Sequence, residues 1–455
     1  MGNEFDFLTH LPAIMPEIGL AILAIVVLGL DLFLPESRRR SIALVAGIGL
    51  AALALTPLLW GPPAVPTGIG PEEQNQVLLF WGGMVRHDVL AQVFKVMVLL
   101  AGAFTSLMSI DVNGIGRKGE FYLTIIVATL GASLMSAAAD LIMIFVALET
   151  TTIPLYILAG FKRNDGRSAE SGMKYFLFGS FMSAVMLYGL SLLYGFTGQT
   201  NIYALADFLT SPAFGENPVP VLGAMVLILV GFGFKISAVP FHFWTPDVYE
   251  GAPTPVTAYV SVASKAASFA LLLRFLVAVF PADMMIGGAE IHGFWVQLAA
   301  VTAVITMTLG NVVALAQRNI KRLLAYSSIA QAGYTLIGLA AIGAQEQSVA
   351  AVAFYMFMYT FTNLLAFAVV VLFSEATGSE TIADLAGLSR RSPWLALTMT
   401  IALLSLGGVP PAAGFFGKFF LFQAAVAADL TWLAIYGVLM SIIALYYYLV
   451  VVKVM

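Results

Sequence analysis

Four ionisable side chains stand inside long apolar runs of this sequence, where a charge has to face other protein groups or water. They are Glu149 in ALETTTIPLY, Lys235 in FGFKISAVP, Lys265 in VASKAASF and Lys418 in FFGKFF. One such charge at the centre of a membrane helix costs about 2.5–3.5 kcal/mol, so a group of this kind calls for a functional explanation. One carboxylate cannot neutralise three amines, and desolvation with like-charge repulsion favours loss of a proton from at least one lysine. The chemistry that we expect from this set is the uptake and release of protons.

A static interpretation stands beside this one, because the same four residues could form fixed ion pairs that hold helices together. Other charges in apolar runs are expected to be structural or interfacial, since they stand within reach of the membrane surface. These are Glu17, Asp31, Lys95, Lys174 and Arg274. Lys174 is the strongest candidate for an exception, because it enters its run from the side of a basic loop.

The composition indicates which elements carry these residues. Of 455 residues, 60% are hydrophobic and only 10% are charged, which lies outside the range of soluble domains. Continuous apolar runs of about 20 residues, long enough to cross a lipid bilayer as helices, recur along the chain. We therefore predict an all-α polytopic membrane protein with about thirteen spanning helices. The predicted spans are 11–34, 41–60, 89–110, 119–138, 140–161, 170–196, 218–240, 253–278, 293–316, 319–342, 348–374, 393–426 and 430–452.

Charges in the predicted loops indicate an orientation. Alternate loops are basic, and the positive-inside rule places basic loops on the cytoplasmic side, so the N-terminus is expected outside. One predicted inside loop, 241–252, departs from the pattern because it carries Asp247 and Glu250 but no Lys or Arg. The basic residues that define the inside are Arg38, Arg39, Arg40, Arg117, Lys118, Lys162, Arg163, Arg167, Arg318, Lys321, Arg322, Arg390, Arg391 and Lys453.

Two of the predicted spans are interrupted. The seventh, 218–240, and the twelfth, 393–426, each contain a Val-Pro step, at Pro240 and Pro410. Proline removes a helix hydrogen bond, and in a membrane the freed groups need protein or a hydrated cavity beside them. The recurrence suggests two five-helix repeats, whose topologies are opposite because five is odd, as in many transporters. The predicted units are 1–110 with helices one to three, 111–280 with helices four to eight, and 281–455 with helices nine to thirteen.

The sequence offers no redox centre or metal site of its own. Zero cysteines exclude disulfides, thiolate-bound iron–sulfur clusters and cysteine nucleophiles. The four histidines, His10, His87, His242 and His292, have no ligand spacing, so no bound metal is expected. A net charge of −4 spread over the whole chain gives no footprint for nucleic acid.

One stretch carries a family resemblance. FKISAVPFHFWTPDVYEGAPTPVTAYVSVASKAA, residues 234–267, resembles the antiporter-like membrane subunits of respiratory complex I, the proton-pumping NADH:quinone oxidoreductase, and of Mrp-type cation/proton antiporters. The WTPDVYEGAPTP run is most similar to subunit N, the bacterial counterpart of mitochondrial subunit 2, whereas the sister subunits have a WLPDA-type sequence. The resemblance extends over nearly the whole chain and includes ALETTTIPLYILAG, KYFLFGS, NIKRLLAYSSIAQAGY and GGVPPAAGFFGKF.

The resemblance implies roles for the four buried charges. Glu149 is similar to the glutamate that pairs with the lysine of the first broken helix, and Lys235 to that lysine. Lys265 is similar to the central residue that passes the proton on, and Lys418 to the residue on the exit side. The supporting residues are expected to be Lys174, Pro240, Pro410 and His242. The family fold has fourteen helices in this subunit, one more than the runs counted here.

The resemblance also implies a setting. The chain would be a proton-translocating subunit of a translocase in the bacterial inner membrane, with its N-terminus on the periplasmic side. NADH, FMN, iron–sulfur clusters and quinone would be bound by partner subunits and none by this chain. Its membrane partners would be the neighbouring antiporter-like subunit M and the small subunits K, J and A. An Mrp-type antiporter subunit, which uses nearly the same residues, and a non-pumping membrane scaffold remain as alternatives.

Overall fold

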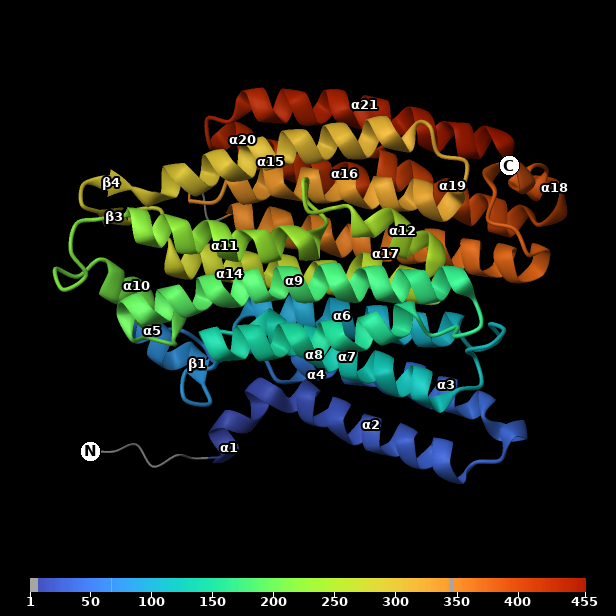
Figure 1. Cartoon of the computed structure of the whole chain (residues 1–455), viewed down its shortest axis with the longest axis horizontal. Coiled ribbons are helices and arrows are strands. Elements are labelled where there is room, and N and C mark those ends of the chain that lie inside the picture. Colours follow the sequence, from blue (N-terminus) through green and yellow to red (C-terminus); the bar gives the residue numbers. More distant parts are fainter. Residues whose placement is uncertain (1–6, 67, 344–346) are drawn as a thin grey trace.

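The chain folds as a bundle of helices that run roughly parallel to its long axis (Figure 1). The structure is a computed structural model that describes residues 7–66, 68–343 and 347–455. Within these residues, 12 helical segments are long and apolar enough to cross a membrane. The predicted twelfth span is a further crossing that consists of two shorter apolar helices, α19 (Pro393–Gly407) and α20 (Ala413–Ala427). The predicted all-α polytopic membrane fold is therefore confirmed.

The first three crossings form an N-terminal group with a small hairpin at one end. Asp88 begins the third crossing by accepting a hydrogen bond from the N–H of Ala91 at 2.9 Å, which satisfies a main-chain donor of the first turn. The elements are α1 (Phe7–His10), η1 (Leu11–Ile14), α2 (Met15–Phe33), η2 (Glu36–Arg38), α3 (Arg40–Leu53), α4 (Thr56–Leu59), α5 (Pro71–Leu78), β1 (Leu79–Phe80), β2 (Val85–Arg86) and α6 (Val89–Met108).

The remaining crossings follow as two sets in chain order. The first set contains α7 (Gly119–Ala137), α8 (Leu141–Ala159), α9 (Gly166–Thr197), α10 (Ile202–Leu209), α11 (Val219–Ile236), α12 (Trp244–Gly251), α13 (Thr254–Tyr259), the π-helical turn η3 (Val260–Ser264) and α14 (Lys265–Val279). The second set contains β3 (Met285–Ile286), β4 (Ala289–Glu290), α15 (Ile291–Ala314), α16 (Ile320–Ala340), α17 (Gln347–Thr377), η4 (Ile382–Leu385), α18 (Leu388–Arg391), α19, α20 and α21 (Thr431–Val454).

The helices α8 and α16 begin in the same way at opposite ends of the bundle. Asp140 caps α8 and Asn319 caps α16, each by accepting from main-chain N–H groups of its own first turn. Each cap also pairs with the N-cap of a later short element: Asp140 with Asn201 before α10, and Asn319 with Thr381 before η4. Figure 1 shows α10 at one end and α18, which follows η4, at the other. Matching local structures at opposite ends are what inverted repeats produce, while the predicted unit boundaries stay a prediction.

Both predicted helix breaks are present, and they share one geometry. The first half-helix, α11, ends at Ile236 before Ser237 with φ 63°, and α19 ends at Gly407 before Gly408 with φ 82°. A left-handed residue at this position turns the chain out of the helix and lets nearby N–H groups cap its last carbonyls. Gly408 adopts the left-handed conformation at no steric cost, whereas Ser237 adopts it at a cost, because its Cβ crowds the neighbouring main chain.

The hydrogen bonds at the two breaks correct the predicted alignment of the repeats. Ala238 donates to the carbonyl of Gly233 at 2.8 Å, and Val409 donates to that of Leu404 at 3.0 Å. If Ala238 is aligned with Val409 by these bonds, Pro240 aligns with Pro411. The sequence-based prediction had aligned the two Val-Pro steps, and therefore Pro240 with Pro410. That alignment was wrong by one residue, because the two repeats correspond in where the helix ends and not in the Val-Pro step.

The predicted loop 241–252 is largely helical, so its prediction as a loop was wrong. The half-helix α12 covers Trp244–Gly251 and packs against α9 and α16. Its residues Trp244, Thr245 and Val248 are buried, which explains why this short polar stretch returns into the bundle. Periodicity could not reveal it, because the helix is only 8 residues long.

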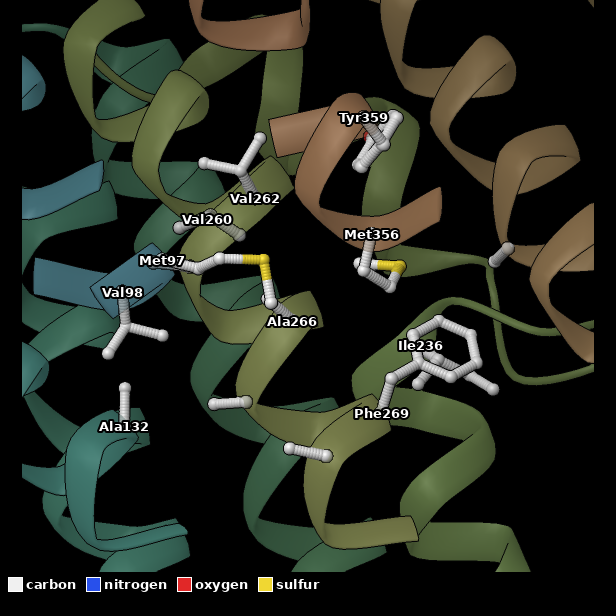
Figure 2. Packing of buried hydrophobic residues seen from close by; sticks show 14 of the residues in the cluster. Met97, Val98, Ala132, Ile236, Val260, Val262, Ala266, Phe269, Met356 and Tyr359 are labelled. Carbon is white, nitrogen blue, oxygen red and sulfur yellow. The ribbon is translucent and has the colours of Figure 1, made fainter. Parts of the chain in front are cut away.

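An apolar core surrounds the helix that carries Lys265. Figure 2 shows Ala266 of α14 with Met97 of α6 and Ala132 of α7 on one side, and Ile236 of α11 and Met356 of α17 on the other. All five are buried within one continuous cluster. Close packing of this kind fixes rotamers and leaves little room for movement, so the core holds the neighbouring polar side chains in defined positions.

Candidate functional site

Lys235 lies in the last turn of α11, beside the first helix break. The residue is only 4% exposed, and its Nζ has no hydrogen-bond partner among the described residues. Nζ lies 5.3 Å from the ring centroid of Phe234 and 5.8 Å from that of Tyr156. Aromatic faces attract an ammonium group, and so does the C-terminal end of a helix. These weak contacts position the side chain of Lys235 but supply no opposite charge for its ammonium group.

Glu149 approaches this region from α8 but forms no ion pair with Lys235. Thr152 donates to Oε2 of Glu149 at 3.3 Å, while Oε1 is buried without a partner in the described part of the chain. Among the described residues, no carboxylate oxygen of Glu149 lies within 4.0 Å of Nζ of Lys235. The two charges still interact through space. The direct pairing that the family resemblance implied is therefore a longer-range attraction in this structure.

Neighbouring side chains satisfy main-chain groups that the first break leaves free. The N–H of Val239 donates to Oγ1 of Thr306 on α15 at 3.1 Å, and Nε1 of Trp244 donates to the carbonyl of Phe234 at 3.1 Å. The break thus has protein partners beside it, as an interrupted helix in a membrane requires. Pro240 lies exposed within the break, and His242 is buried with Nδ1 unpaired among the described atoms. Their supporting roles stay predictions.

Lys265 follows directly on the π-helical turn η3 and is 2% exposed. Its Nζ donates to Oγ of Ser328 at 2.6 Å and to the carbonyl of the same residue at 2.8 Å. Tyr359 of α17 donates to the same Oγ at 2.8 Å. All of these partners are neutral oxygens, so Lys265 is held by hydrogen bonds and not by an opposite charge. π-Helical turns occur frequently at functional sites.

Lys418 lies on α20 and points back at the second helix break. Its Nζ donates to the carbonyl of Gly407 at 3.3 Å and lies 4.3 Å from the ring centroid of Tyr334. Lys418 is 4% exposed, and no carboxylate pairs with it in the described ion pairs. A Cβ added at Gly408 would lie 3.0 Å from Cδ of Lys418, so glycine leaves room there for the lysine. Pro410 is exposed in this break, and its supporting role stays a prediction.

The structure brings two of the predicted residues to one helix. Lys265 contacts Ser328 and Lys418 contacts Tyr334, and both partners belong to α16. These two partners are separated by about 9 Å along the helix axis at a rise of 1.5 Å per residue. Lys235 shares no hydrogen-bond partner with them, because its Nζ has none among the described residues.

Lys174 forms an ion pair with Asp247 of the half-helix α12. Its Nζ lies 2.6 Å from Oδ2 of Asp247 and 2.7 Å from Oε1 of Glu170, while Arg322 of α16 binds Asp247 at 3.0 Å and Glu250 at 2.9 Å. Partial burial raises the pKa of Asp247, but Lys174 and Arg322 outweigh this and hold it below its ordinary value. Lys174 of α9 and Arg322 of α16 therefore neutralise Asp247 and Glu250, the acidic residues of the one predicted inside loop that has no Lys or Arg.

Two buried ion pairs favour the structural interpretation of Glu17, Lys95 and Arg274 over the interfacial one. Arg274 donates to Asp88 through two bonds of 2.7 and 2.8 Å. Glu17 and Lys95 lie 2.9 Å apart with side chains 7% and 3% exposed. Ser133 donates to the same Glu17 oxygen at 2.6 Å. The sequence could not reveal these partners, since each pair joins helices far apart in the chain.

The described residues contain no cluster of three or more His, Cys, Asp or Glu that could hold a metal ion. The site consists instead of amines and one carboxylate, supported by a set of hydroxyl and amide groups on α16, α17 and α21. Sequence reasoning missed these neutral residues, because Ser, Gln and Tyr in apolar helices give no signal comparable to a charge. Buried amines with neutral partners can bind a proton from a neighbouring group or water and release it to the next.

The fold is that of the family to which the chain belongs. Residues 138–444 match the family model of the NADH:quinone oxidoreductase/Mrp antiporter transmembrane segment, so the chain is a member of that family and a multi-pass membrane protein. Among its relatives is NADH-quinone oxidoreductase subunit N of Moorella thermoacetica, 44% identical over 450 residues that cover 98% of this chain and 89% of the relative. NAD(P)H-quinone oxidoreductase subunit 2 of Trichormus variabilis is 44% identical over 97% of this chain and 81% of its own length.

Solved structures show the same architecture. A chain of respiratory complex I from Thermus thermophilus is 33% identical and superimposes with a TM-score of 0.75 over 96% of this chain and 89% of that one. A chain of the Mrp complex from Dietzia superimposes with a TM-score of 0.80 over 98% of this chain and 80% of that one. Its identity is 22%, so this second likeness establishes the fold alone.

Proposed function

We propose that this chain is a proton-translocating membrane subunit of an NADH:quinone oxidoreductase, and hence part of a translocase that carries no redox centre in this subunit. One observation carries the proposal: Lys235, Lys265 and Lys418 are buried beside helix breaks or a π-helical turn, and none of them has a carboxylate partner within 4.0 Å among the described residues. Static ion pairs would place carboxylates against these amines. The relatives that bear the name of this enzyme support the assignment.

Each of the four charged residues has its own role in the proposed proton transfer. Glu149 attracts the ammonium of Lys235 across a gap, so a charge change that reaches Glu149 alters the proton affinity of Lys235 without breaking a bond. The proton then passes to Lys265 and on to Lys418 near the second break. Moving one charge against 100 mV takes about 2.3 kcal/mol. At a separation beyond 4.0 Å, a Coulomb interaction in a partly desolvated site can still reach about 2–3 kcal/mol, which is of the required size.

The driving force and the partners lie outside this chain. We propose that NADH, FMN, iron–sulfur clusters and quinone are bound by other subunits, and that quinone reduction there changes the charge state near Glu149. The membrane partners would be subunit M and the small subunits K, J and A. The setting would be the bacterial inner membrane, with the N-terminus on the periplasmic side. The basic loops on the opposite side support this orientation through the positive-inside rule.

An Mrp-type cation/proton antiporter subunit is the second candidate. The family model spans both classes, and the Mrp complex shares the fold. Such a subunit would be driven by an ion gradient in place of a redox reaction. A non-pumping scaffold is the third candidate, and it requires the buried lysines to act only in assembly.

The composition of the native particle tests the assignment. We expect the detergent-extracted particle to have the native mass of a large assembly, to contain flavin and iron, and to oxidise NADH. A particle without flavin and iron that exchanges cations for protons in vesicles would contradict the proposal and favour the antiporter. A matched preparation from cells that lack this chain serves as the control.

A further inference from the structure

Polar side chains occupy one face of α16 between the contacts of Lys265 and Lys418. Gln331 follows Ser327 by four residues and Ser328 by three, and Tyr334 follows Gln331 by three. These spacings place the polar side chains on one side of the helix. Ser327, Ser328, Gln331 and Tyr334 are all no more than 2% exposed. Buried polar groups at this density are costly unless they are hydrogen-bonded, so their bonds define what the face can do.

Gln331 stands at the centre of this face and contacts three other helices. Its Nε2 donates to the carbonyl of Leu406 at 3.0 Å and to the hydroxyl of Tyr448 at 3.2 Å. Its Oε1 accepts a hydrogen bond from Tyr355. One amide thus joins α17, the broken end of α19, and α21.

The carbonyl of Leu406 fixes the orientation of this amide. A carbonyl only accepts, so the Nε2 of Gln331 has to face it and Oε1 has to face Tyr355. Tyr355 is therefore the donor in its bond. Tyr448 accepts from Nε2, which directs its own proton toward Oγ of Ser327 at 2.5 Å. The amide determines the direction of both hydroxyls.

The two lysines lie at the two ends of this arrangement. Lys265 is bonded to Ser328, one turn before Gln331, and Lys418 is bonded to the carbonyl of Gly407, next to the carbonyl that Gln331 binds. An amide stays neutral at ordinary pH, because it neither gains nor loses a net proton there. It is suited to orienting a proton path and unsuited to storing a proton.

We propose that Gln331 is a positioning residue for proton transfer between Lys265 and Lys418. It holds the end of α19 against α16 and sets the direction of the Tyr355 and Tyr448 hydroxyls. This inference rests on the proposed function. It predicts that the geometry of the amide, and not merely a polar group of that size, is needed for transport.

The test uses the intact membrane complex with two substitutions at this position. Gln331→Leu removes every bond of the amide, and Gln331→Glu keeps the shape but places an ionisable acid beside two amines. Thr335→Val is the matched control, because Thr335 is buried on the same helix and its hydroxyl bonds back to the carbonyl of Gln331 at 2.9 Å and to Met356 sulfur at 3.6 Å. The readouts are the amount of chain in the complex, protons moved per NADH, and the pH profile of coupled turnover.

We expect Gln331→Leu to assemble and to lower coupled proton transport on the order of tenfold, because the hydroxyls of Tyr355 and Tyr448 lose the partner that orients them. We expect Gln331→Glu to assemble and to change the pH profile. Transport and pH profiles like those of the control in both variants would overturn the proposal. Failure of both variants to assemble, with normal assembly of Thr335→Val, would assign Gln331 a structural role and would overturn it as well.

Lys265→Met in the same complex separates this inference from the proposed function. If Lys265→Met abolishes transport while the Gln331 variants are normal, only the role of Gln331 fails. If the assembled Lys265→Met complex transports protons normally, the relay itself fails.

Discussion

Ser328 occupies the position in α16 that Glu149 occupies in α8. Each is the ninth residue after the N-cap of its helix, and the two helices begin at opposite ends of the bundle. Glu149 interacts through space with Lys235, and Ser328 is hydrogen-bonded to Lys265. The inverted repeats thus present a carboxylate to one lysine and a neutral hydroxyl to the other. A change in charge near Glu149 can therefore alter the proton affinity of Lys235 in the first repeat, whereas in the second repeat Lys265 is surrounded by neutral hydroxyl groups.

The first prediction concerns the carboxylate. Glu149→Gln keeps the shape of the side chain but removes its attraction for Lys235, so we expect assembly to persist and coupled proton transport to fall at least about tenfold. Proton movement per NADH in membrane vesicles measures the effect. Glu120→Gln at the exposed start of α7 is the control, and transport equal to that control would contradict a role for Glu149.

The second prediction concerns the neutral partner. Ser328→Ala removes one of the two bonds that Ser328 makes with Lys265 and also the acceptor of Tyr359, so we expect transport to fall while the chain still assembles. Ser328→Thr retains a hydroxyl and should recover part of the activity. Vesicle proton uptake measures both variants, and equal rates in the two would show that the hydroxyl is not used.

The third prediction concerns the stability of the N-terminal group. Asp88→Asn keeps the helix cap but removes the carboxylate that pairs with Arg274, whose side chain is 3% exposed. Loss of one partner of a buried pair costs about 3–5 kcal/mol, so we expect this chain to leave the purified particle at a lower temperature. Asp111→Asn, which alters a pair that is 64% and 76% exposed, should have almost no effect.

The pH dependence of that variant follows from the same pair. Burial raises the pKa of Asp88, but Arg274, together with the N–H of Ala91 and with Arg86, outweighs burial and lowers the pKa from 3.8 to about 2. A carboxylate with a lowered pKa contributes stability above its ordinary pKa and loses it as the pH falls toward the lowered value. The difference between wild type and Asp88→Asn should therefore be full above about pH 4 and shrink between pH 4 and 2. A difference that stays constant over this range would contradict the ion pair.

Much of this architecture could be predicted from the sequence because the bilayer imposes strong rules. Continuous apolar runs predicted the crossings, and Pro240 with Pro410 predicted both interrupted helices. The run 241–252 was misread as a loop, because a half-helix of 8 residues with Asp247 and Glu250 has no membrane signature. Its charges are satisfied by Lys174 and Arg322, which are distant in sequence.

The candidate site could be predicted only in part. The four charges were visible because a charge in an apolar run is costly and therefore conspicuous. Their neutral partners Ser328 and Gln331 were not, since small polar residues are common in membrane helices. The register of the two breaks also required the structure, because it depends on the hydrogen bonds after Ile236 and Gly407 and not on the proline positions.

Substitution of Lys235 by arginine tests the central claim most directly. Arginine keeps the positive charge but does not readily release a proton, so a relay predicts that the Lys235→Arg complex assembles fully yet oxidises NADH slowly and moves few protons. The measurement is the number of protons moved per NADH in vesicles that contain equal amounts of assembled complex. Wild-type proton transport in the assembled Lys235→Arg complex would contradict the relay and would leave the buried lysines as structural charges.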